Sequence, residues 1–548
     1  MKKTYILFIS LFALLLCGCS KDYLNTAPTS SISGSAVFES AENMKMAING
    51  LNRLLRKQWF SSQGWNGQGT TMLYYGEYPG DELTVYLTGW TNTICGKYHD
   101  SSTSTYDYHP WHVYYMIIGN ANSIIENVDK FGSDLSKDLK FIKAQALTYR
   151  AYAYYYLSQL YGRRWVDAGA PESKAVVLRL DTSTGDQALC TLSELYAQIY
   201  KDLDDAIGYY KGSYDRTSTD IMGLDVAYAI YSRIALAKQD WETAYKMAKT
   251  VIDSKNYSLM SVDEYKKGFC HANNEWIWYL VGNEQEDLYY YSFAAYIGWN
   301  VQASQCRTYP KCMSKQIYTQ IPTTDIRKKM FLDPDNPYYG EAPESPKKIS
   351  YTAASGKISA SASVDLAYQY AKDADMLNAH AGFPLTTFTP YIYMQFKFAK
   401  DSKVVGTAIT DVPLMRLSEM YLNAAEAACM LTKVDNRPGV EVAKELLVAL
   451  TKTSGRDAAY TAPATDNQAE LLEHIKLYTK IELWGEGFNW FNIKRWNDTI
   501  HRISIQADGE DKGKGSWFAA VALDIAPSDM NNQTWVVPQK EKDYNHAI

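Results

Sequence analysis

Three charged residues in the second half of the chain lie at spacings that bring them onto one helical surface. Arg416, Glu419 and Glu426 occur in the Ala-rich stretch 413–431, and the two glutamates are two helical turns apart on one face. Two carboxylates on one face can carry out general acid–base catalysis. Because the stretch is Ala-rich and amphipathic, we interpret the three residues instead as structural ion pairs that link packed helices. The same interpretation applies to a second charged set, Glu486, Lys494 and Arg495.

Metal binding is the next chemistry to consider, because His109 and His112 stand close together in His-Pro-Trp-His. A proline follows the first histidine and the set holds only two ligands, so the pattern does not predict a metal site. The acidic stretches 333–336 and 508–511 offer oxygen ligands for Ca²⁺. We interpret both as solvated turns, so the sequence permits a structural Ca²⁺ but does not indicate one. The sequence also lacks a Gly-x-Ser-x-Gly elbow and a Gly-rich phosphate loop.

The cysteines near the start of the chain indicate lipid modification. A positive pair, Lys2 and Lys3, precedes an apolar run that extends to Leu16. This run is shorter than the ~20 residues that span a bilayer and fits the ~7–15 residues of a secretory signal. Leu-Cys-Gly-Cys at 16–19 then resembles a bacterial lipobox, which predicts a signal peptide over 1–18 and acylation of Cys19. The alternative is an ordinary signal peptide with incidental cysteines. Acylation would anchor the protein to a membrane surface without spanning it.

Composition excludes several classes of protein. The 548 residues carry a formal charge of −6, which provides no basic field for nucleic acid. The chain has 45 tyrosines and 14 tryptophans against 16 phenylalanines, and Tyr and Trp combine an apolar face with a polar edge that suits wet binding surfaces. The alternative is that many of these tyrosines pack between helices. The cysteines outside the predicted signal peptide and lipobox form no Cys-x-x-Cys pair, which argues against structural zinc, and Cys306 with Cys312 is the nearest candidate disulfide.

Helices must position most of these residues. A run without Gly or Pro that stops at Gly162 predicts a helix over 141–161. Apolar residues at three- and four-residue steps predict two helices over 225–252, with Asp240 near the bend, and a helix over 413–431 that begins after Pro413. Two more helices are predicted over 191–210 and 471–496, the second leading into an aromatic-rich turn. Paired helices with small residues at their crossings resemble tetratricopeptide hairpins. Between the helices, 60–110, 280–400 and 505–535 predict long ordered loops with short strands.

We therefore predict a mainly α fold, a tetratricopeptide-like helical repeat scaffold with long loop-rich insertions that carry short strands. The expected organisation is a signal peptide (1–18), a lipidated N-terminus and tether (19–40), an N-terminal helical region (41–260) and a C-terminal region with loop insertions (261–548). The last two regions are expected to pack into one fold. A scaffold of this kind presents its insertions as a binding face.

Six segments, in order along the chain, resemble the SusD/RagB family of outer-membrane nutrient-binding lipoproteins of Bacteroidetes. They are KDYLNTAPTSSIS (21–33), WHVYYMIIGNANSIIENVD (111–129), KAQALTYRAYAYYYLSQLYG (143–162), DVPLMRLSEMYLNAAEA (411–427), IELWGEGFNWFNIKRW (481–496) and VVPQKE (536–541). One stretch departs from the family pattern. The helix after the fourth segment usually carries an Asn and two Arg, whereas 443–457 has only Arg456, so what those side chains support locally is open.

The resemblance implies a cell-surface lipoprotein that binds an oligosaccharide or polysaccharide and acts as a lid on a SusC-type TonB-dependent transporter. It implies no catalysis and no cofactor. Two alternatives stay open: capture of peptides, or a role purely as a transporter lid. A surface glycoside hydrolase is a third, for which no pair of carboxylates stands out. The identity of the ligand cannot be derived from the sequence.

The resemblance also places ligand contacts in loops after the first helix and in the middle of the chain. The matching stretches here are 63–69, 77–92 and 288–310. Within them we predict ligand contacts for Trp65, Asn66, Trp90, Asn92, Tyr296, Trp299, Asn300 and Arg307. The rings would stack on sugar faces, and Asn and Arg would bond to hydroxyls. The alternative for each aromatic is packing of its own loop, and we interpret Asp81 as loop-fixing.

Overall fold

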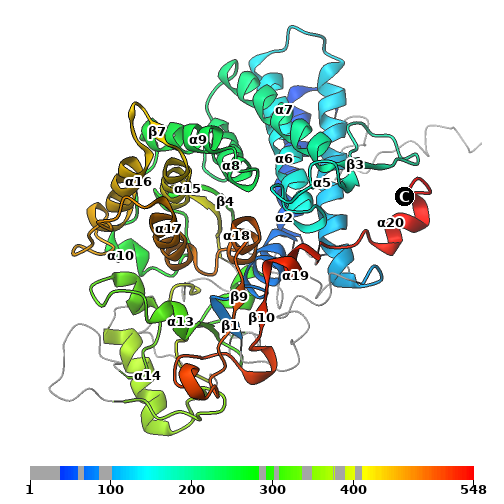
Figure 1. The fold of residues 1–548 in the computed structure, drawn as a ribbon. Coiled ribbons are helices and arrows are strands. Elements are labelled where there is room, and N and C mark those ends of the chain that lie inside the picture. The colour runs from blue at the N-terminus through cyan, green and yellow to red at the C-terminus, as the bar shows by residue number, and fades with distance from the viewer. Residues whose placement is uncertain are drawn as a thin grey trace, which may run out of the picture.

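The structure is a computed structural model that describes residues 38–57, 59, 67–85, 101–282, 292–301, 306, 308–335, 348–373, 376, 389–401, 410–532 and 534–548. Helices dominate and the strands are short (Figure 1). The α-helices are α2 (Ala41–Arg56), α3 (Gly67–Thr70), α5 (Thr105–Asp129), α6 (Lys137–Tyr161), α7 (Leu192–Lys211), α8 (Leu224–Ala237), α9 (Trp241–Ser254), α10 (Val262–Tyr265), α11 (Phe293–Ile297), α13 (Lys315–Tyr318), α14 (Ser361–Asp373), α15 (Leu417–Met430), α16 (Gly439–Val448), α17 (Gln468–Leu483), α18 (Asn489–Trp496), α19 (Pro527–Asn532) and α20 (Gln539–Tyr544). Shorter π and 3₁₀ turns include η3 (Thr71–Glu77), η6 (Ile326–Met330), η8 (Ala449–Thr453), η9 (Gly509–Asp511) and η10 (Ala519–Val521).

The strands form antiparallel pairs rather than a continuous sheet. The pairs, each named with its bounds, are β1 (Leu83–Val85) with β5 (Lys311–Met313), β2 (Lys174–Val177) with β3 (Leu189–Thr191), β4 (Trp276–Leu280) with β6 (Val412–Arg416), β7 (Lys433–Val434) with β8 (Arg437–Pro438), and β9 (Ile500–His501) with β10 (Asp524–Ile525). The predicted mainly α scaffold with short strands is confirmed.

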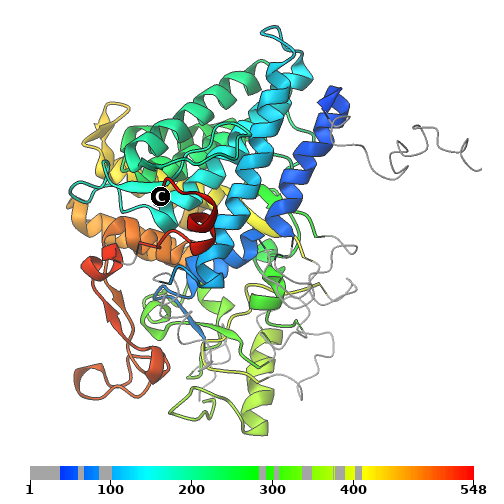
Figure 2. The same ribbon diagram turned by 90° about the vertical axis from the view of Figure 1, so that its right-hand side faces the viewer.

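The long helices pack side by side in the order α5, α6, α7, α8, α9 and α15, with α16 and α17 beyond (Figures 1 and 2). The repeat-like hairpin predicted over 225–252 is α8 and α9, and Asp240 caps α9 by accepting a bond from the backbone N–H of Thr243 at 3.2 Å. The helix predicted over 141–161 is α6, which ends at Gly162 as expected. A capping box of Thr191 and Glu194 starts α7.

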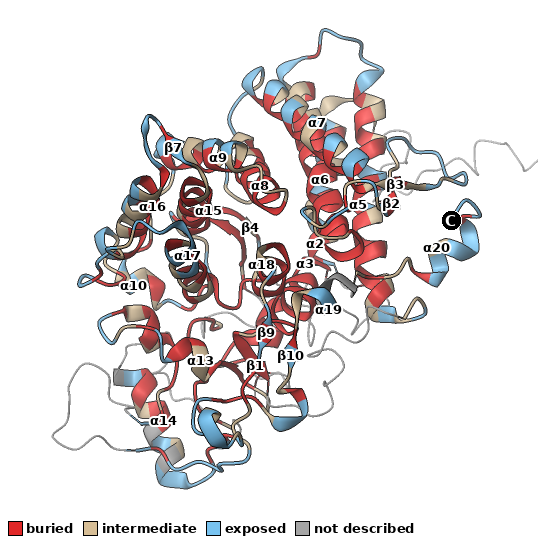
Figure 3. Cartoon of the chain, viewed as in Figure 1, coloured by how far each residue is buried: buried red, intermediate tan, exposed pale blue. Residues whose placement is uncertain are grey.

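Tyrosine and tryptophan side chains fill much of the space between these helices. The rings of Tyr114 on α5 and Tyr156 on α6 stack in parallel with centroids 5.2 Å apart, and Tyr152 meets Trp278 edge-on. Nine of the twelve tryptophans that the structure describes are buried, and Figure 3 colours the inward helix faces as buried. The packing alternative for the aromatics therefore holds for most of the tryptophans, and their number does not by itself indicate a sugar-binding surface.

The prediction for 413–431 was wrong at its start. Residues 412–416 form strand β6 rather than the first turn of a helix, and α15 begins at Leu417. The reason is tertiary: Val412–Arg416 pairs with Trp276–Leu280, a strand more than 130 residues upstream, with Trp276 opposite Arg416. The region 60–110 also differs from a pure loop, since 67–77 is helical and α5 begins at Thr105.

Among the described residues, no helix is both long enough and apolar enough to cross a membrane. The predicted signal peptide and Cys19 lie outside these residues.

Candidate functional site

Two of the stretches predicted to contact ligand meet in space although more than 200 residues separate them. β1 lies within the stretch 77–92 and pairs with β5, which directly follows the stretch 288–310, with Leu83 opposite Met313 and Val85 opposite Lys311. Next to this pair, the ring of Tyr74 on η3 contacts the ring of Tyr296 on α11, with centroids 5.1 Å apart. We call residues 71–85, 292–301 and 308–313 the β1–β5 junction. It lies below the row of long helices in Figure 1.

The predicted contact residues fall into two groups. Trp65, Asn66, Trp90, Asn92 and Arg307 lie outside the described residues, so their contacts stay predictions. The other three belong to the β1–β5 junction.

Within the junction, the two predicted aromatic contacts are buried. Tyr296 is 0% exposed and Trp299 is 2% exposed, and the Trp299 ring packs edge-on against Phe396. In this arrangement neither ring offers a face to a ligand. Asn300 fixes the chain, because its side chain donates to the Lys400 carbonyl at 2.7 Å and accepts from the Lys400 N–H at 2.6 Å.

Asp81 fixes its loop, as predicted. Its carboxylate accepts bonds from Lys480 at 2.9 and 2.7 Å, and its backbone N–H donates to Asn489 at 2.7 Å. Both partners come from the far end of the chain, so the C-terminal helices hold the junction in place. The quoted stretches omitted Tyr74, although an aromatic run directly before the stretch at 77 is a signal that could have included it.

Lys311 gives the junction a buried cation. Its ammonium group donates to the carbonyl of Tyr309 at 2.9 Å and lies 6.0 Å from the ring centre of Tyr78. Burial lowers the pKa of Lys311 to about 8. The neighbouring thiols of Cys306 and Cys312 are both buried and unbridged, so the structure does not contain the candidate disulfide. Burial raises the pKa of Cys306 to about 12, which makes it a poor nucleophile.

Comparison with known proteins identifies the family. A sequence model of the SusD family matches residues 241–548, which is more than half of the chain. The chain belongs to the SusD family. A second model, described as starch-binding and associating with the outer membrane, matches residues 62–236. The two matches together cover both the helical row and the junction.

Relatives of this SusD-family chain are distant in sequence and close in fold. SusD-like protein P2 of Formosa agariphila is 26% identical over 258 residues, which is 46% of this chain and 47% of that protein. The match thus spans about half the length of this curated relative. A SusD-like carbohydrate binding protein from Bacteroides vulgatus has a TM-score of 0.69 at 20% identity, covering 93% of this chain and 97% of its own. A SusD superfamily protein from Bacteroides thetaiotaomicron has a TM-score of 0.67 at 20% identity, covering 93% and 99%.

Buried ion pairs account for the charged residues that first suggested acid–base chemistry. Glu419 pairs with Arg233 of α8, whose guanidinium donates at 2.7 and 2.8 Å, and Glu426 pairs with Arg495 of α18. The predicted structural role is confirmed for Arg416, Glu419 and Glu426. The second set differs in its partners. Glu486 pairs with Arg416 and Lys397, whereas Lys494 donates to two backbone carbonyls at the end of α6.

Eight buried charged side chains form a continuous cluster, which we call the central ion cluster. Its cations and anions are equal in number, and each side chain is at most 5% exposed: Arg327, Lys397, Arg416, Arg456, Glu275, Asp325, Glu482 and Glu486. Arg456, the single arginine of the stretch 443–457, lies just after η8 and bridges Glu275 and Glu482 at 2.9 Å each. This settles what that arginine supports. It joins two carboxylates at the centre of the cluster.

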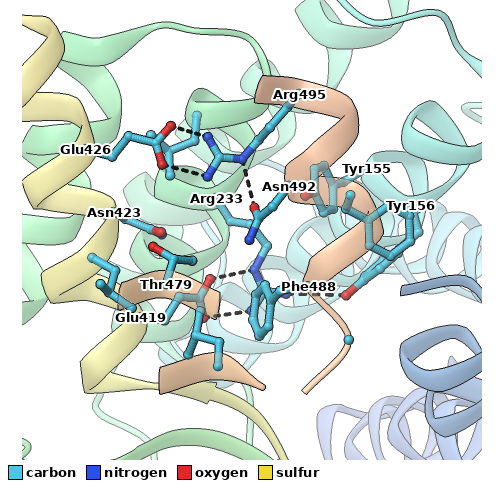
Figure 4. Close-up of a pocket in the computed structure, with 15 residues that line it drawn as sticks. Tyr155, Tyr156, Arg233, Glu419, Asn423, Glu426, Thr479, Phe488, Asn492 and Arg495 are labelled. Carbon is cyan, nitrogen blue, oxygen red and sulfur yellow. Dashed lines mark hydrogen bonds and ion pairs between the residues drawn. The ribbon is translucent and has the colours of Figure 1, made fainter. Parts of the chain in front are cut away.

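A small cavity lies among the ion pairs of α8, α15, α17 and α18 (Figure 4). The Arg233–Glu419 and Arg495–Glu426 pairs line it, together with Asn492, which accepts a bond from the Arg495 side chain at 2.9 Å. Its volume of about 20 Å³ is close to the space that one water molecule requires. The cavity is too small for a sugar ring, so these charges stabilise the SusD-family scaffold.

The two histidines considered for metal binding each contact a tyrosine hydroxyl instead. His109 lies 3.3 Å from the Tyr75 hydroxyl, and His112 lies 3.2 Å from that of Tyr108. Within the described ranges, no group of three or more His, Cys, Asp or Glu side chains is arranged to hold a metal ion. Residues 508–511 form an exposed turn, and Asp333 accepts a bond from Tyr318 at 3.1 Å.

Proposed function

We propose that this SusD-family protein captures a glycan at the cell surface and delivers it to a SusC-type TonB-dependent transporter, on which it acts as a lid. Membership of the family carries the proposal. The meeting of β1 with β5 supports it, because it brings the two predicted contact stretches to one place on the molecule. Lipid attachment at Cys19 would hold the protein on the outer membrane.

The contacts expected at such a site set the scale of affinity. Stacking one sugar face on an aromatic ring removes about 80 Å² of apolar surface from water, which stabilises the complex by about 2 kcal/mol. Hydroxyl groups add little unless side chains replace the water they lose. Two or three rings, less the free-energy cost of association, give dissociation constants of roughly millimolar to micromolar. Trp65 and Trp90 are the rings we expect to contribute most.

Peptide capture is the second candidate function. The burial of nine tryptophans in the core removes most of the compositional preference for sugar. A peptide ligand would bind at the same junction, but through hydrogen bonds to its backbone rather than through stacking on aromatic rings. The two candidates therefore predict different behaviour on a panel of polysaccharides.

The decisive experiment uses residues 20–548, screened against plant, microbial and host polysaccharides by affinity electrophoresis. We expect at least one ligand, with binding weakened at least tenfold in Trp65→Ala or Trp90→Ala. Tyr544→Ala is the matched control, because Tyr544 is 84% exposed on α20 and removes an aromatic ring without disturbing the core. Trp299→Ala is unsuitable, since loss of a buried ring would unfold its surroundings.

The outcomes separate the candidates. Binding that survives both tryptophan substitutions would keep the function and move the site. A folded protein that binds no polysaccharide would favour peptide capture or a lid role, which a pull-down of the transporter would then test. New reducing ends after incubation with a bound glycan would show catalysis and overturn the binding-only proposal.

A further inference from the structure

Two buried acids, Glu77 and Glu82, lie where the β1–β5 junction meets residues 484–489, which we call the α17–α18 turn. Their exposed fractions are 0% and 1%. One carboxylate oxygen of Glu77, Oε1, accepts bonds from the N–H groups of Gly487 at 2.5 Å and Phe488 at 3.0 Å. Oε2 of Glu82 accepts a bond from the side-chain amide of Asn489 at 2.8 Å. Both acids therefore bond to the same turn.

The backbones of the two segments touch at positions where only glycine fits. A Cβ on Gly76 would lie 2.3 Å from the carbonyl oxygen of Gly487. Gly487 has a φ of +90°, and a Cβ there would lie 2.7 Å from the Cα of Met72. Such close approach means that residues 71–85 cannot shift against the turn without breaking the bonds of the two acids.

The cations near the two acids bond to other groups. Lys480 on α17 bonds to Asp81, and Lys397 bonds to Glu486 at 2.7 Å. Arg502 donates to backbone carbonyls of residues 78 and 80 rather than to a carboxylate. No described cation therefore forms an ion pair with either acid. Two adjacent buried acids without a cation cannot both ionise cheaply.

The protonation of the pair follows from this geometry. Burial raises the pKa of Glu77 to about 7, although the hydrogen bonds from the turn act to lower it. Burial, and then the charge of Glu77, raise the pKa of Glu82 well above its usual range. Acids coupled in this way titrate as a pair.

We propose that Glu77 and Glu82, both kept protonated by burial without a cation, hold residues 71–85 against the α17–α18 turn, which makes the two acids and Asn489 positioning residues for the β1–β5 junction. The pair does not touch the ligand. It fixes η3 and β1, and through β1 it fixes the pairing with β5. The effect on ligand binding rests on the proposed function, whereas the effect on the backbone does not.

The direction of the pH dependence is fixed by the raised pKa. Contact between the segments is fully stabilised below the ordinary glutamate pKa and weakens as pH rises through about 7. If the released acid has the ordinary value of 4.5, the held state weakens roughly 70-fold between pH 5 and pH 8. This figure counts Glu77 alone, and the raised pKa of Glu82 adds to the loss over the same range.

Hydrogen exchange in residues 71–85, corrected for intrinsic rates, tests the proposal between pH 5 and pH 8. In wild type, the protection factors of these residues should fall by a factor of at least several tens across this range. Because burial alone raises the pKa of each acid, the test uses the double variant Glu77→Gln/Glu82→Gln, which removes both titrating acids while keeping side chains of the same shape and should reduce the loss to about fivefold or less. Glu510→Gln, on an exposed turn, is the control and should behave as wild type.

Equal loss of protection in wild type and the double variant, or none in wild type, would overturn the proposal. With a glycan found in the panel, its dissociation constant should rise with pH in wild type and stay flat in the double variant. If exchange follows the prediction but no glycan binds, the role of the two protonated acids stands and the proposed function fails. If the glycan binds and exchange is independent of pH, the reverse holds.

Discussion

Glu482 at the centre of the ion cluster offers the sharpest test of how this scaffold is stabilised. Its carboxylate accepts bonds from Arg327 at 3.0 Å and Arg456 at 2.9 Å, and it also bonds to Arg416 at 3.2 Å. Burial opposes the charged form, but the three guanidinium groups outweigh it and hold the pKa of Glu482 well below its usual range. Glu482→Gln removes the charge and places an amide donor among three cationic donors.

The expected cost is that of breaking a buried ion pair, about 3–5 kcal/mol in free energy of unfolding, because the arginines stay buried with one anion fewer. For a chain of about 500 residues this corresponds to a fall in Tm of roughly 3–5 °C. The contribution of Glu482 is present above the ordinary glutamate pKa and is lost as pH falls below it. The difference between variant and wild type should therefore shrink between about pH 5 and pH 3.

Urea denaturation followed by circular dichroism measures the change at pH 7. Glu445→Gln is the matched control, since Glu445 also bonds to an arginine, Arg437 at 2.9 Å, but the two side chains are 61% and 47% exposed. An exposed pair contributes at most about 1 kcal/mol. A loss under 1 kcal/mol in Glu482→Gln, or equal losses in the two variants, would refute the view that the cluster stabilises the fold.

Two further predictions concern close packing. Gly487→Ala should destabilise the protein by several kcal/mol, because it combines a positive φ with a steric overlap against Met72, whereas Gly132→Ala, with a φ of +85° and open space, should cost only about 1 kcal/mol; comparable costs in thermal denaturation would show that the contact is not tight. The buried thiols of Cys306 and Cys312 should react with Ellman's reagent only after denaturation. Fast reaction of the native protein, or a 306–312 bridge by mass spectrometry, would contradict their buried, reduced state.

Local patterns in the sequence were sufficient for the long helices. The run without Gly or Pro before Gly162 specifies α6. Apolar residues three and four positions apart on either side of Asp240 specify α8 and α9. The structural role of Glu419 and Glu426 also followed from local context, because carboxylates on an Ala-rich helix need buried cations. The identity of those cations did not, since they come from other helices.

Long-range pairing decided the rest. Residues 412–416 form a strand despite their helical periodicity, because they pair with the strand at Trp276–Leu280. Tyr296 and Trp299 became core residues for a similar reason. An aromatic in a loop has the same sequence signature whether its ring faces solvent or a neighbour such as Tyr74 or Phe396.

The sequence by itself determined the family, the helical class and the stretches from which a binding face is built, because each is encoded in local composition and spacing. Only the tertiary structure decided that β1 meets β5, that Arg456 closes a buried ion cluster, and that Glu77 and Glu82 lie against one turn. These depend on contacts across hundreds of residues. Burial then changes the chemistry of the groups involved, since a carboxyl group's charge is costly away from water unless a cation accompanies it.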